Sequence, residues 1–329
     1  MENKIGQLID LVKKLPEDCL DETIEYVNKI IEMNKGQTPS LPCPHCKSKN
    51  TVKFGQMGGK QRYRCKDCSK TFVETTNTVM YYARESEAVW KQIIRDTIDG
   101  VSLDETAQSL DLSHATAFNM RHKILQALED AEKRNPTELS GVCEIDDTFV
   151  LESLKGTRLP GDYWRSPRKH GAVAQKRGIS EEYVSISTGI ERDGCCVAKT
   201  VTRATPGKDD IAQVFGERIS GDALILTDGA KSYDVLVTNC GCSVENVKEH
   251  EQGFYNINTV NGFHSFIKER YNKYRGVATK YLNRYNVLFA KSFRNRSEAV
   301  DEVYNILMSN SEQNYNSIQS FKTLNLLNV

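Results

Sequence analysis

Two Cys-x-x-Cys pairs constrain the fold of this chain more than any other feature. Cys43 and Cys46 form the first pair, and Cys65 and Cys68 form the second pair eighteen residues later. Paired knuckles at this separation supply four thiolates for a tetrahedral zinc ion, and the Gly-Gly pair between them suits a hairpin turn. The segment is too short and polar to fold without such a staple. We therefore predict a zinc ribbon over residues 40–75, with structural Zn²⁺.

The length and composition indicate a protein with several domains and no membrane segment. A chain of 329 residues exceeds what one hydrophobic core usually serves. Its apolar runs all fall short of the roughly 18 residues that a membrane-spanning helix needs. The first residues lack the basic and then apolar pattern of a secretory signal. We expect a cytoplasmic protein, in which zinc is a better account of the four cysteines than disulfides.

The charges are balanced overall but unevenly distributed. The chain has 44 basic and 44 acidic residues. Residues 41–70 nevertheless contain eight Lys or Arg and one acidic residue, and residues 155–177 contain seven and one. Basic patches on a balanced protein are typical of nucleic-acid binding. The alternative interpretation of each patch is a solvated loop.

Helical periodicity dominates the segments on either side of the ribbon. Residues 1–36 carry two apolar stripes and are predicted to form a helical N-terminal segment. Residues 84–133 show a helix, a short helix behind a Ser-x-x-Glu capping box, a tight turn and a longer helix. This spacing is typical of a helix-turn-helix module, although a generic helical bundle fits it equally well. The predicted solvent face of the third helix includes His114 and His122 and supplies four candidate DNA contacts, which are Thr116, Asn119, Arg121 and Lys123.

The segment 140–300 shows the alternation of an α/β domain. Strands are predicted at 142–150, 183–190, 195–202 and 223–228, with a helix at 207–219 before the last of them. Three strands, a helix and a further strand are the element order of an RNase H-like mixed sheet with flanking helices. Long helices are predicted to follow, and residues 301–329 are predicted to form a C-terminal helical tail.

Two aspartates and one helix carry the candidate site. Asp146 lies inside an apolar strand, Asp228 ends another, and sites in α/β sheets gather at the carboxyl ends of strands. Asn261 and Lys268 stand seven residues apart, so both leave one face of the same helix. Two carboxylates and an amide oxygen could hold Mg²⁺ or Mn²⁺ against a phosphodiester. Asp147 remains the fallback for Asp146, because strand alternation points the two side chains to opposite faces.

Several segments in order carry a resemblance to a known family. They are Glu144-Ile-Asp146-Asp-Thr, Gln175-Lys-Arg-Gly-Ile-Ser180, Thr227-Asp-Gly-Ala-Lys-Ser-Tyr233, Asn258-Thr-Val-Asn261 through Lys268, and Gly276-Val-Ala-Thr-Lys-Tyr-Leu282. Behind a matching ribbon, they resemble the zinc-ribbon insertion-sequence transposases of the DDE superfamily, over roughly residues 40–295. The resemblance implies an RNase H-like domain that excises and inserts DNA with divalent metal. It gives Asp146 and Asp228 the places of the catalytic aspartates, and Lys268 that of the basic residue.

The third acidic position departs from the superfamily's usual pattern. Asn261 stands where most relatives carry Glu, although one branch of the family is similar in having Asn. An amide oxygen can ligate Mg²⁺ but brings no charge and no basicity. Asn261 is therefore either a weaker ligand in an active enzyme or a mark of decay. Because the surrounding motif is intact, we expect activity.

The sequence thus predicts a transposase that binds the terminal repeats of its element. We expect double-stranded DNA as partner and a homodimer or larger synaptic complex, since two ends must be paired. Two alternatives remain: a DNA-binding regulator derived from a transposase, and a metal-dependent nuclease that does not join ends. Further candidate DNA contacts come from the second basic segment and from the stretch after the Lys268 helix; they are Arg168, Lys169, Lys176, Arg177 and Arg275.

Overall fold

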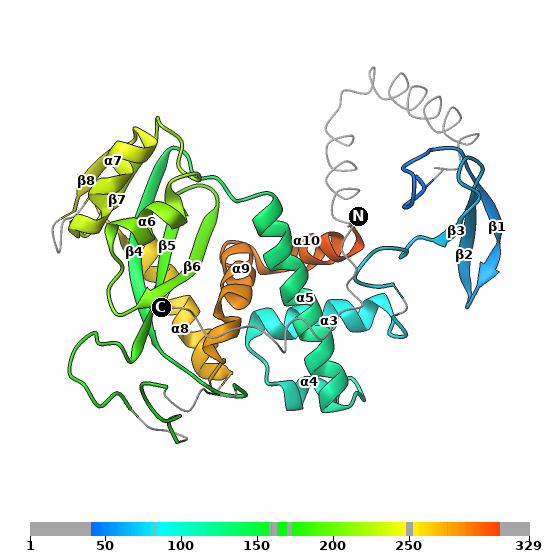
Figure 1. Cartoon of the computed structure of the whole chain (residues 1–329), viewed down its shortest axis with the longest axis horizontal. Coiled ribbons are helices and arrows are strands. Elements are labelled where there is room, and N and C mark those ends of the chain that lie inside the picture. Colours follow the sequence, from blue (N-terminus) through cyan, green and yellow to red (C-terminus); the bar gives the residue numbers. More distant parts are fainter. Residues whose placement is uncertain are drawn as a thin grey trace, which may run out of the picture. The chain divides into compact units, whose positions relative to one another are not determined.

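The computed structural model describes residues 41–309 apart from 82, 158, 160–162, 170–172, 248–252 and 275. The contacts divide the chain into two compact units, Met1–Thr76 and Asn77–Val329 (Figure 1). The helical prediction for residues 1–36 lies outside the described residues, as does the part of the predicted tail beyond residue 309.

The described part of the first unit is a small three-stranded antiparallel sheet. Its strands are β1 (Thr51–Met57), β2 (Lys60–Cys65) and β3 (Thr71–Val73), in the order β1-β2-β3. Gly58 and Gly59 make the hairpin turn with φ of 56° and 76°, which residues with a side chain rarely adopt. The apolar core consists of little more than Phe72 and two cysteines, with the Tyr63 ring stacked against it.

Three helices open the second unit, and local signals set their ends. They are α3 (Glu87–Asp99), α4 (Leu103–Ser109) and α5 (His114–Arg134). A serine side chain caps the start of each helix, and the predicted capping box between Ser102 and Glu105 is present. Gly100 ends α3 in the left-handed conformation. The three predicted helices are therefore present, while their role as a DNA-reading module stays a prediction.

The rest of the second unit is built on a mixed five-stranded sheet in the order β6-β5-β4-β7-β8. Its strands β4, β5 and β6 pair antiparallel, whereas β7 pairs parallel with β4, and β8 pairs parallel with β7. This is the mixed sheet expected from the sequence. The bounds are β4 Val142–Leu151, β5 Tyr183–Glu191, β6 Cys196–Arg203, β7 Leu224–Thr227 and β8 Ser243–Asn246.

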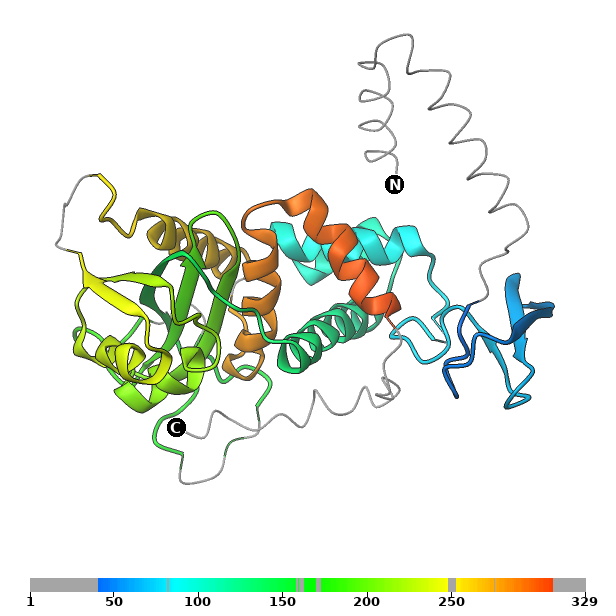
Figure 2. The ribbon, with the colours of Figure 1, turned by 90° about the horizontal axis from the view of Figure 1, so that it is seen from above.

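Helices cover both faces of this sheet (Figures 1 and 2). On one face α8 and α9 pack with strand residues such as Ile186, and on the other α6 and α7 pack with residues such as Ile145. The 3₁₀ turn η1 precedes α7, η2 precedes α9, and α10 packs on α3. The bounds are α6 Lys208–Phe215, η1 Lys231–Tyr233, α7 Asp234–Cys240, α8 Asn258–Lys273, η2 Thr279–Tyr281, α9 Leu282–Ser292 and α10 Arg296–Met308.

One continuous core joins α3 and α5 to the α8 face of the sheet. It contains Ile94 of α3, Leu128 of α5, Ile186 of β5 and Phe289 of α9, all fully buried. Because fully burying one such side chain contributes roughly 1.5–3 kcal/mol, this shared core holds the helices and the sheet in one unit.

The core between the sheet and the helices α6 and α7 requires a glycine at one position in β5. Gly189 pairs with Ile145 of β4, and a Cβ placed on it would lie 2.8 Å from Leu139 Cδ1 and 2.9 Å from Phe215 Cε1. These atoms belong to buried side chains that have little room to move. This close approach explains why a glycine, which is a weak strand former, stands among the apolar residues of β5.

We expect Gly189→Ala to lower the free energy of unfolding of the second unit by about 1–3 kcal/mol through overpacking. Gly262→Ala is the control, because Gly262 lies inside α8 with its nearest atom, Phe293 Cζ, 4.0 Å from the added Cβ. That change should stabilise the protein by about 0.5–1 kcal/mol. Urea unfolding followed by tryptophan fluorescence measures both, since Trp90 and Trp164 are the protein's two tryptophans. A Gly189→Ala variant as stable as the wild type would contradict the packing argument.

Candidate functional site

Asp146 lies in the middle of β4, on the face that α8 covers. Its Oδ2 is 3.8 Å from Nδ1 of His264, a buried residue of α8. The Thr188 hydroxyl on β5 donates to the carbonyl oxygen of Asp146 at 2.7 Å and lies 2.6 Å from His264 Nε2. Asp146 is thus in direct contact with α8, and its side chain remains 20% exposed.

Asp228 reaches the same region from the neighbouring strand. The parallel register between β4 and β7 pairs Glu144 with Leu226, so two residues further along, Asp228 stands level with Asp146. Residues that are level on adjacent strands point to the same face of the sheet. The Asp228 side chain is exposed, and its Oδ1 accepts a hydrogen bond from the backbone of Ala230 at 3.0 Å.

The face of α8 that meets Asp146 carries both of the predicted helix residues. Asn261, His264 and Lys268 follow at intervals of three and four residues, which places them in one row along the helix. The middle residue is buried against Asp146, whereas Asn261 and Lys268 are exposed. Asp146, Asp228 and Lys268 are thus close enough for their charges to interact, and Asn261 lies one turn before His264 in the same row of α8.

The electrostatics of this cluster disfavour a bare carboxylate at Asp146. Burial raises the pKa of Asp146 to about 7, and the negative charge of Asp228 adds to the increase. The backbone N–H of Asp147 and the charge of Lys268 oppose it. Burial lowers the pKa of His264 to about 4, so this imidazole is neutral at pH 7. A divalent cation beside Asp146 and Asp228 would relieve their repulsion, and oxygen ligands of this kind suit Mg²⁺ or Mn²⁺.

Asp147, the fallback for Asp146, faces the other side of the sheet. Its carboxylate accepts hydrogen bonds from the Ser187 hydroxyl at 2.5 Å and from the Tyr233 hydroxyl at 2.9 Å. Burial raises its pKa as well. Because two hydroxyl groups already hold both of its oxygens, the geometry favours Asp146 as the residue that acts with Asp228.

Glu144 and Arg192 connect β4 and β5 to the start of α8. From the sequence, Glu144 could either support Asp146 or be an ordinary exposed strand residue, and Arg192 had no assigned role. Glu144 is fully buried, and its carboxylate receives the backbone N–H groups of Thr259 and Val260 at the start of α8. Arg192 Nε donates to Glu144 at 2.8 Å. The sequence signal for Glu144 is its position two residues before Asp146, on the same face of the strand. Arg192 follows β5 by one residue and has no local signal.

Two buried carboxylates organise the basic loop between β4 and β5. Glu152 pairs with Arg165 and Arg203 at 2.7 and 3.0 Å. Glu182 pairs with Arg168 at 2.7 Å and also accepts from the backbone of Gln175 and Lys176. Arg168, a predicted DNA contact, therefore has a carboxylate partner inside the protein. The other three predicted contacts of this loop, Lys169, Lys176 and Arg177, are exposed.

The predicted solvent face of α5 is partly wrong. Arg121 is 1% exposed, and its guanidinium donates to the carbonyl of Val101 and to the hydroxyl of Thr106. His122 is 2% exposed, and its ring lies 4.4 Å from that of Tyr281. The prediction fails because α5 packs against α4 on one side and α9 on another, which leaves only half-buried and buried positions along the middle of the helix. Thr116, Asn119 and Lys123 are half-buried, and Arg275 lies outside the described residues.

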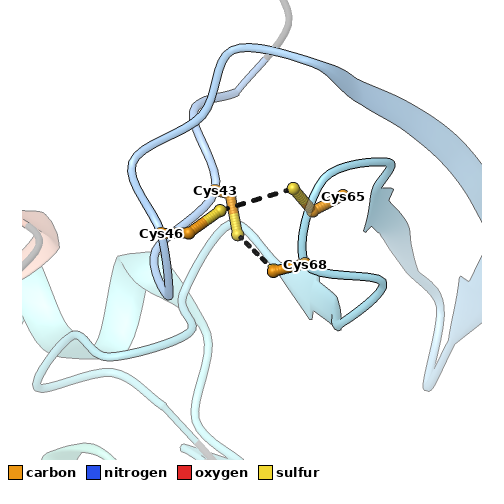
Figure 3. Close-up of side chains that lie close together, drawn as sticks. All are labelled: Cys43, Cys46, Cys65 and Cys68. Carbon is orange, nitrogen blue, oxygen red and sulfur yellow. Dashed lines mark hydrogen bonds between the residues drawn. The ribbon is translucent and has the colours of Figure 1, made fainter.

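The four predicted zinc ligands converge in the first unit (Figure 3). Their Sγ atoms all lie within 4.8 Å of one another. The Sγ–Sγ distance is 3.6 Å between Cys43 and Cys68 and 3.5 Å between Cys46 and Cys65. Zn–S bonds of about 2.3 Å in a tetrahedron require nearly this separation, so the four cysteines fit a structural zinc ion. A hydrogen bond from the backbone of Cys68 lowers the pKa of Cys65 to about 7, whereas that of its hydrogen-bond partner Cys46 is raised to about 12, so Cys65 is the thiol of this pair that ionises first.

Comparisons with known proteins match both units. Residues 138–291 match the model of the ISXO2-like transposase domain, and residues 29–74 match that of the PaaD zinc beta ribbon domain. An uncharacterized protein in transposable element ISH50 of Halobacterium salinarum is 26% identical over 253 residues, which cover 74% of this chain and 82% of that protein.

A solved structure also matches, at a lower level of similarity. A chain of a pre-cleavage Mos1 transpososome is 11% identical, with 67% of this chain and 74% of that chain covered. Its TM-score of 0.26 is too low to establish a common fold. Within the part of the chain that the structure describes, no helix is long and apolar enough to cross a membrane.

Removing zinc should unfold the ribbon alone. We expect Cys65→Ser to abolish zinc binding while urea unfolding of the second unit, followed by tryptophan fluorescence, stays unchanged. Zinc content measured with a chromophoric indicator checks the first result. Cys195→Ser, which removes an exposed thiol outside the cluster, is the control and should retain zinc. A Cys65→Ser protein with full zinc content would remove this residue from the site.

Asp146 should make the metal-free protein less stable as the pH rises. Its pKa of about 7 exceeds the ordinary value of 3.8, so the stabilising neutral form is fully present below about pH 4 and is lost as the pH rises through 7. Asp146→Asn, which stays neutral, should therefore be more stable than the wild type at pH 8, by at most about 4 kcal/mol. Urea unfolding without Mg²⁺ measures the difference, which should vanish near pH 4. An equal gain at both pH values would refute the assignment.

Proposed function

We propose, from the premise that residues 138–291 are an ISXO2-like transposase domain behind a zinc ribbon, that this protein is a DNA transposase active on its own mobile element. It would bind the terminal repeats of the element and catalyse metal-dependent cleavage and strand transfer. The observation that carries the proposal is the convergence of Asp146, Asp228 and the Asn261 face of α8 from three separate segments.

The proposed metal ligands are Asp146, Asp228 and Asn261. Their two carboxylates and one amide oxygen are hard donors, which suit Mg²⁺ or Mn²⁺. A divalent cation held there would lower the pKa of the attacking water and neutralise charge on the phosphodiester. The amide at position 261 is neutral, so the site holds its cation with two negative charges rather than three. We therefore expect this protein to bind Mg²⁺ more weakly, and to need a higher Mg²⁺ concentration, than a site with three carboxylates would.

Lys268 would contact a DNA phosphate beside the reacting bond. It is exposed, it lies on the same face of α8 as Asn261, and its positive charge is felt at both Asp146 and His264. A cation in this position attracts the polyanionic substrate toward the carboxylates, which would otherwise repel it. The proposed site thereby combines negative carboxylates for the metal with a positive side chain for DNA.

DNA binding would be distributed over the ribbon, the helix-turn-helix and the loop between β4 and β5. Thr116, Asn119 and Lys123 are half-buried on α5 and keep part of their surface for DNA, and Lys169, Lys176 and Arg177 are exposed on the loop. Arg121 and Arg168 would instead hold the shape of their own segments, because both have buried partners. Pairing two element ends requires at least two copies of the catalytic domain, so we propose a homodimer or larger complex.

Substitution of Asn261 tests the proposed function most directly. We expect Asn261→Ala to abolish joining of element ends to a supercoiled target, as Asp146→Ala and Asp228→Ala should, because the three residues act as one unit. Binding of labelled element ends, measured by gel shift, should survive in all three. Asn261→Asp adds a charge and should keep measurable activity at a lower Mg²⁺ concentration.

The products of the same reaction separate the alternatives. Joined products from the wild type indicate a transposase, nicks alone indicate a nuclease, and shifted but intact DNA indicates a regulator. Gly262→Ala serves as the matched control on α8, because it alters the neighbouring residue without changing a proposed ligand. Joining by Asn261→Ala at the wild-type rate would exclude this residue from the metal site.

A further inference from the structure

We propose that Glu144 is a positioning residue that fixes the start of α8, and with it Asn261, relative to Asp146. This inference rests on the proposed function, since it assigns Asn261 and Asp146 to one metal site. Glu144 itself touches neither metal nor DNA in this scheme. It acts through the backbone of the helix that carries the third ligand.

The Glu144 carboxylate makes four hydrogen bonds, all from groups far away in the sequence. Oε2 accepts from the backbone N–H groups of Thr259 and Val260, at 2.7 and 2.9 Å. Oε1 accepts from the Thr259 hydroxyl at 2.9 Å and from Arg192 Nε at 2.8 Å. The residue has no exposed surface. A buried carboxylate with all its bonds satisfied holds its partners in a defined geometry.

These bonds replace a cap that α8 cannot make for itself. The first N–H groups of a helix have no partner within the helix and usually receive a Ser, Thr, Asp or Asn side chain. Ile257 occupies the N-cap position of α8, and its aliphatic side chain cannot accept a hydrogen bond. The acceptor comes instead from the central strand β4. The beginning of α8 is therefore tied to the strand that carries Asp146.

Arg192 completes this connection from the end of β5. Besides pairing with Glu144, its guanidinium donates to the carbonyl of Asn256 at 2.8 Å. It also lies beneath the ring of Phe254, 4.9 Å from the centroid. The pair thus holds both the first turn of α8 and the segment that leads into it. Arg192 also neutralises the buried charge, which would otherwise be costly.

The hydrogen bonds of Glu144 also fix the position of Asn261 relative to Asp146. Glu144 and Asp146 lie two residues apart on one face of β4, and Val260 is covalently joined to Asn261. A displacement of the first turn of α8 would move Asn261 but would leave Asp146 and Asp228 on their strands. The expected consequence is a selective loss of the contribution of Asn261 to metal binding.

Metal affinity measured without DNA tests this inference. We expect Glu144→Gln to weaken Mn²⁺ binding, followed by calorimetry of the zinc-loaded protein, by about 10- to 100-fold, as is usual for groups that orient metal ligands. The control is Glu152→Gln, which changes a buried carboxylate just past the other end of β4 that pairs with Tyr163, Arg165 and Arg203. That variant should keep the wild-type affinity for Mn²⁺.

A double-mutant cycle with Asn261→Ala separates positioning from general stability. If Glu144 acts through Asn261, then Glu144→Gln combined with Asn261→Ala should bind Mn²⁺ no more weakly than Asn261→Ala alone. Additive losses would overturn the inference, and so would an unchanged affinity in Glu144→Gln. An unchanged affinity in Asn261→Ala would instead count against the proposed function, so the two failures are distinguishable.

Amide hydrogen exchange gives a readout that does not depend on metal. Thr259 and Val260 should be protected in the wild type and should exchange faster in Glu144→Gln, while amides in the middle of α8 keep their protection. If Glu144→Gln does not fold, Glu144→Asp keeps the charge but withdraws it by one methylene, and the same measurements apply. Unchanged protection at these two amides would overturn the inference.

Discussion

The burial of one side of α8 against the sheet is the interaction on which the candidate site depends. Val260, Phe263 and Ile267 are all fully buried, and each contributes roughly 1.5–3 kcal/mol. This apolar stripe fixes the rotation of the helix about its axis. The row of Asn261, His264 and Lys268 then faces Asp146 because it lies beside the stripe on the same helix. Hydrophobic packing thus orients the polar residues, which could not orient themselves.

The surroundings of Asp146 disfavour the charged form of its carboxyl group. Burial and the charge of Asp228 hold the pKa of Asp146 far above its usual value, and Asp147 on the opposite face is also shifted upward. The hydrophobic core around Asp146 extends from α3 to β6, and its burial offsets the free energy that these unfavourable charges cost. Under the proposed function, the carboxylate that would hold the cation is therefore one that lowers the stability of the metal-free protein.

Buried carboxylates also fix the position of helix ends and loops in the second unit. Glu144 holds the start of α8, Glu152 holds Arg165 and Arg203, and Glu182 holds the backbone of Gln175 and Lys176. Each stands at or near the end of a strand and pairs with at least one arginine, which offsets the cost of burying its charge. The basic loop between β4 and β5 can then display Lys169, Lys176 and Arg177 on a defined framework.

The sequence by itself determined the features that depend on local spacing. Each of these features follows from residues close together in the chain. They are the four cysteines at ribbon spacing, the capping box at Ser102, the four apolar strands and the row from Asn261 to Lys268. Tertiary structure decided the rest. The strand β8 was missed because its four residues include one apolar side chain, Val244. Arg121 and His122 were assigned to solvent because periodicity gives the rows of a helix but not which rows a second neighbour covers. The tie between Glu144, Arg192 and α8 joins residues 48 and 115 positions apart, so only the folded chain brings them together.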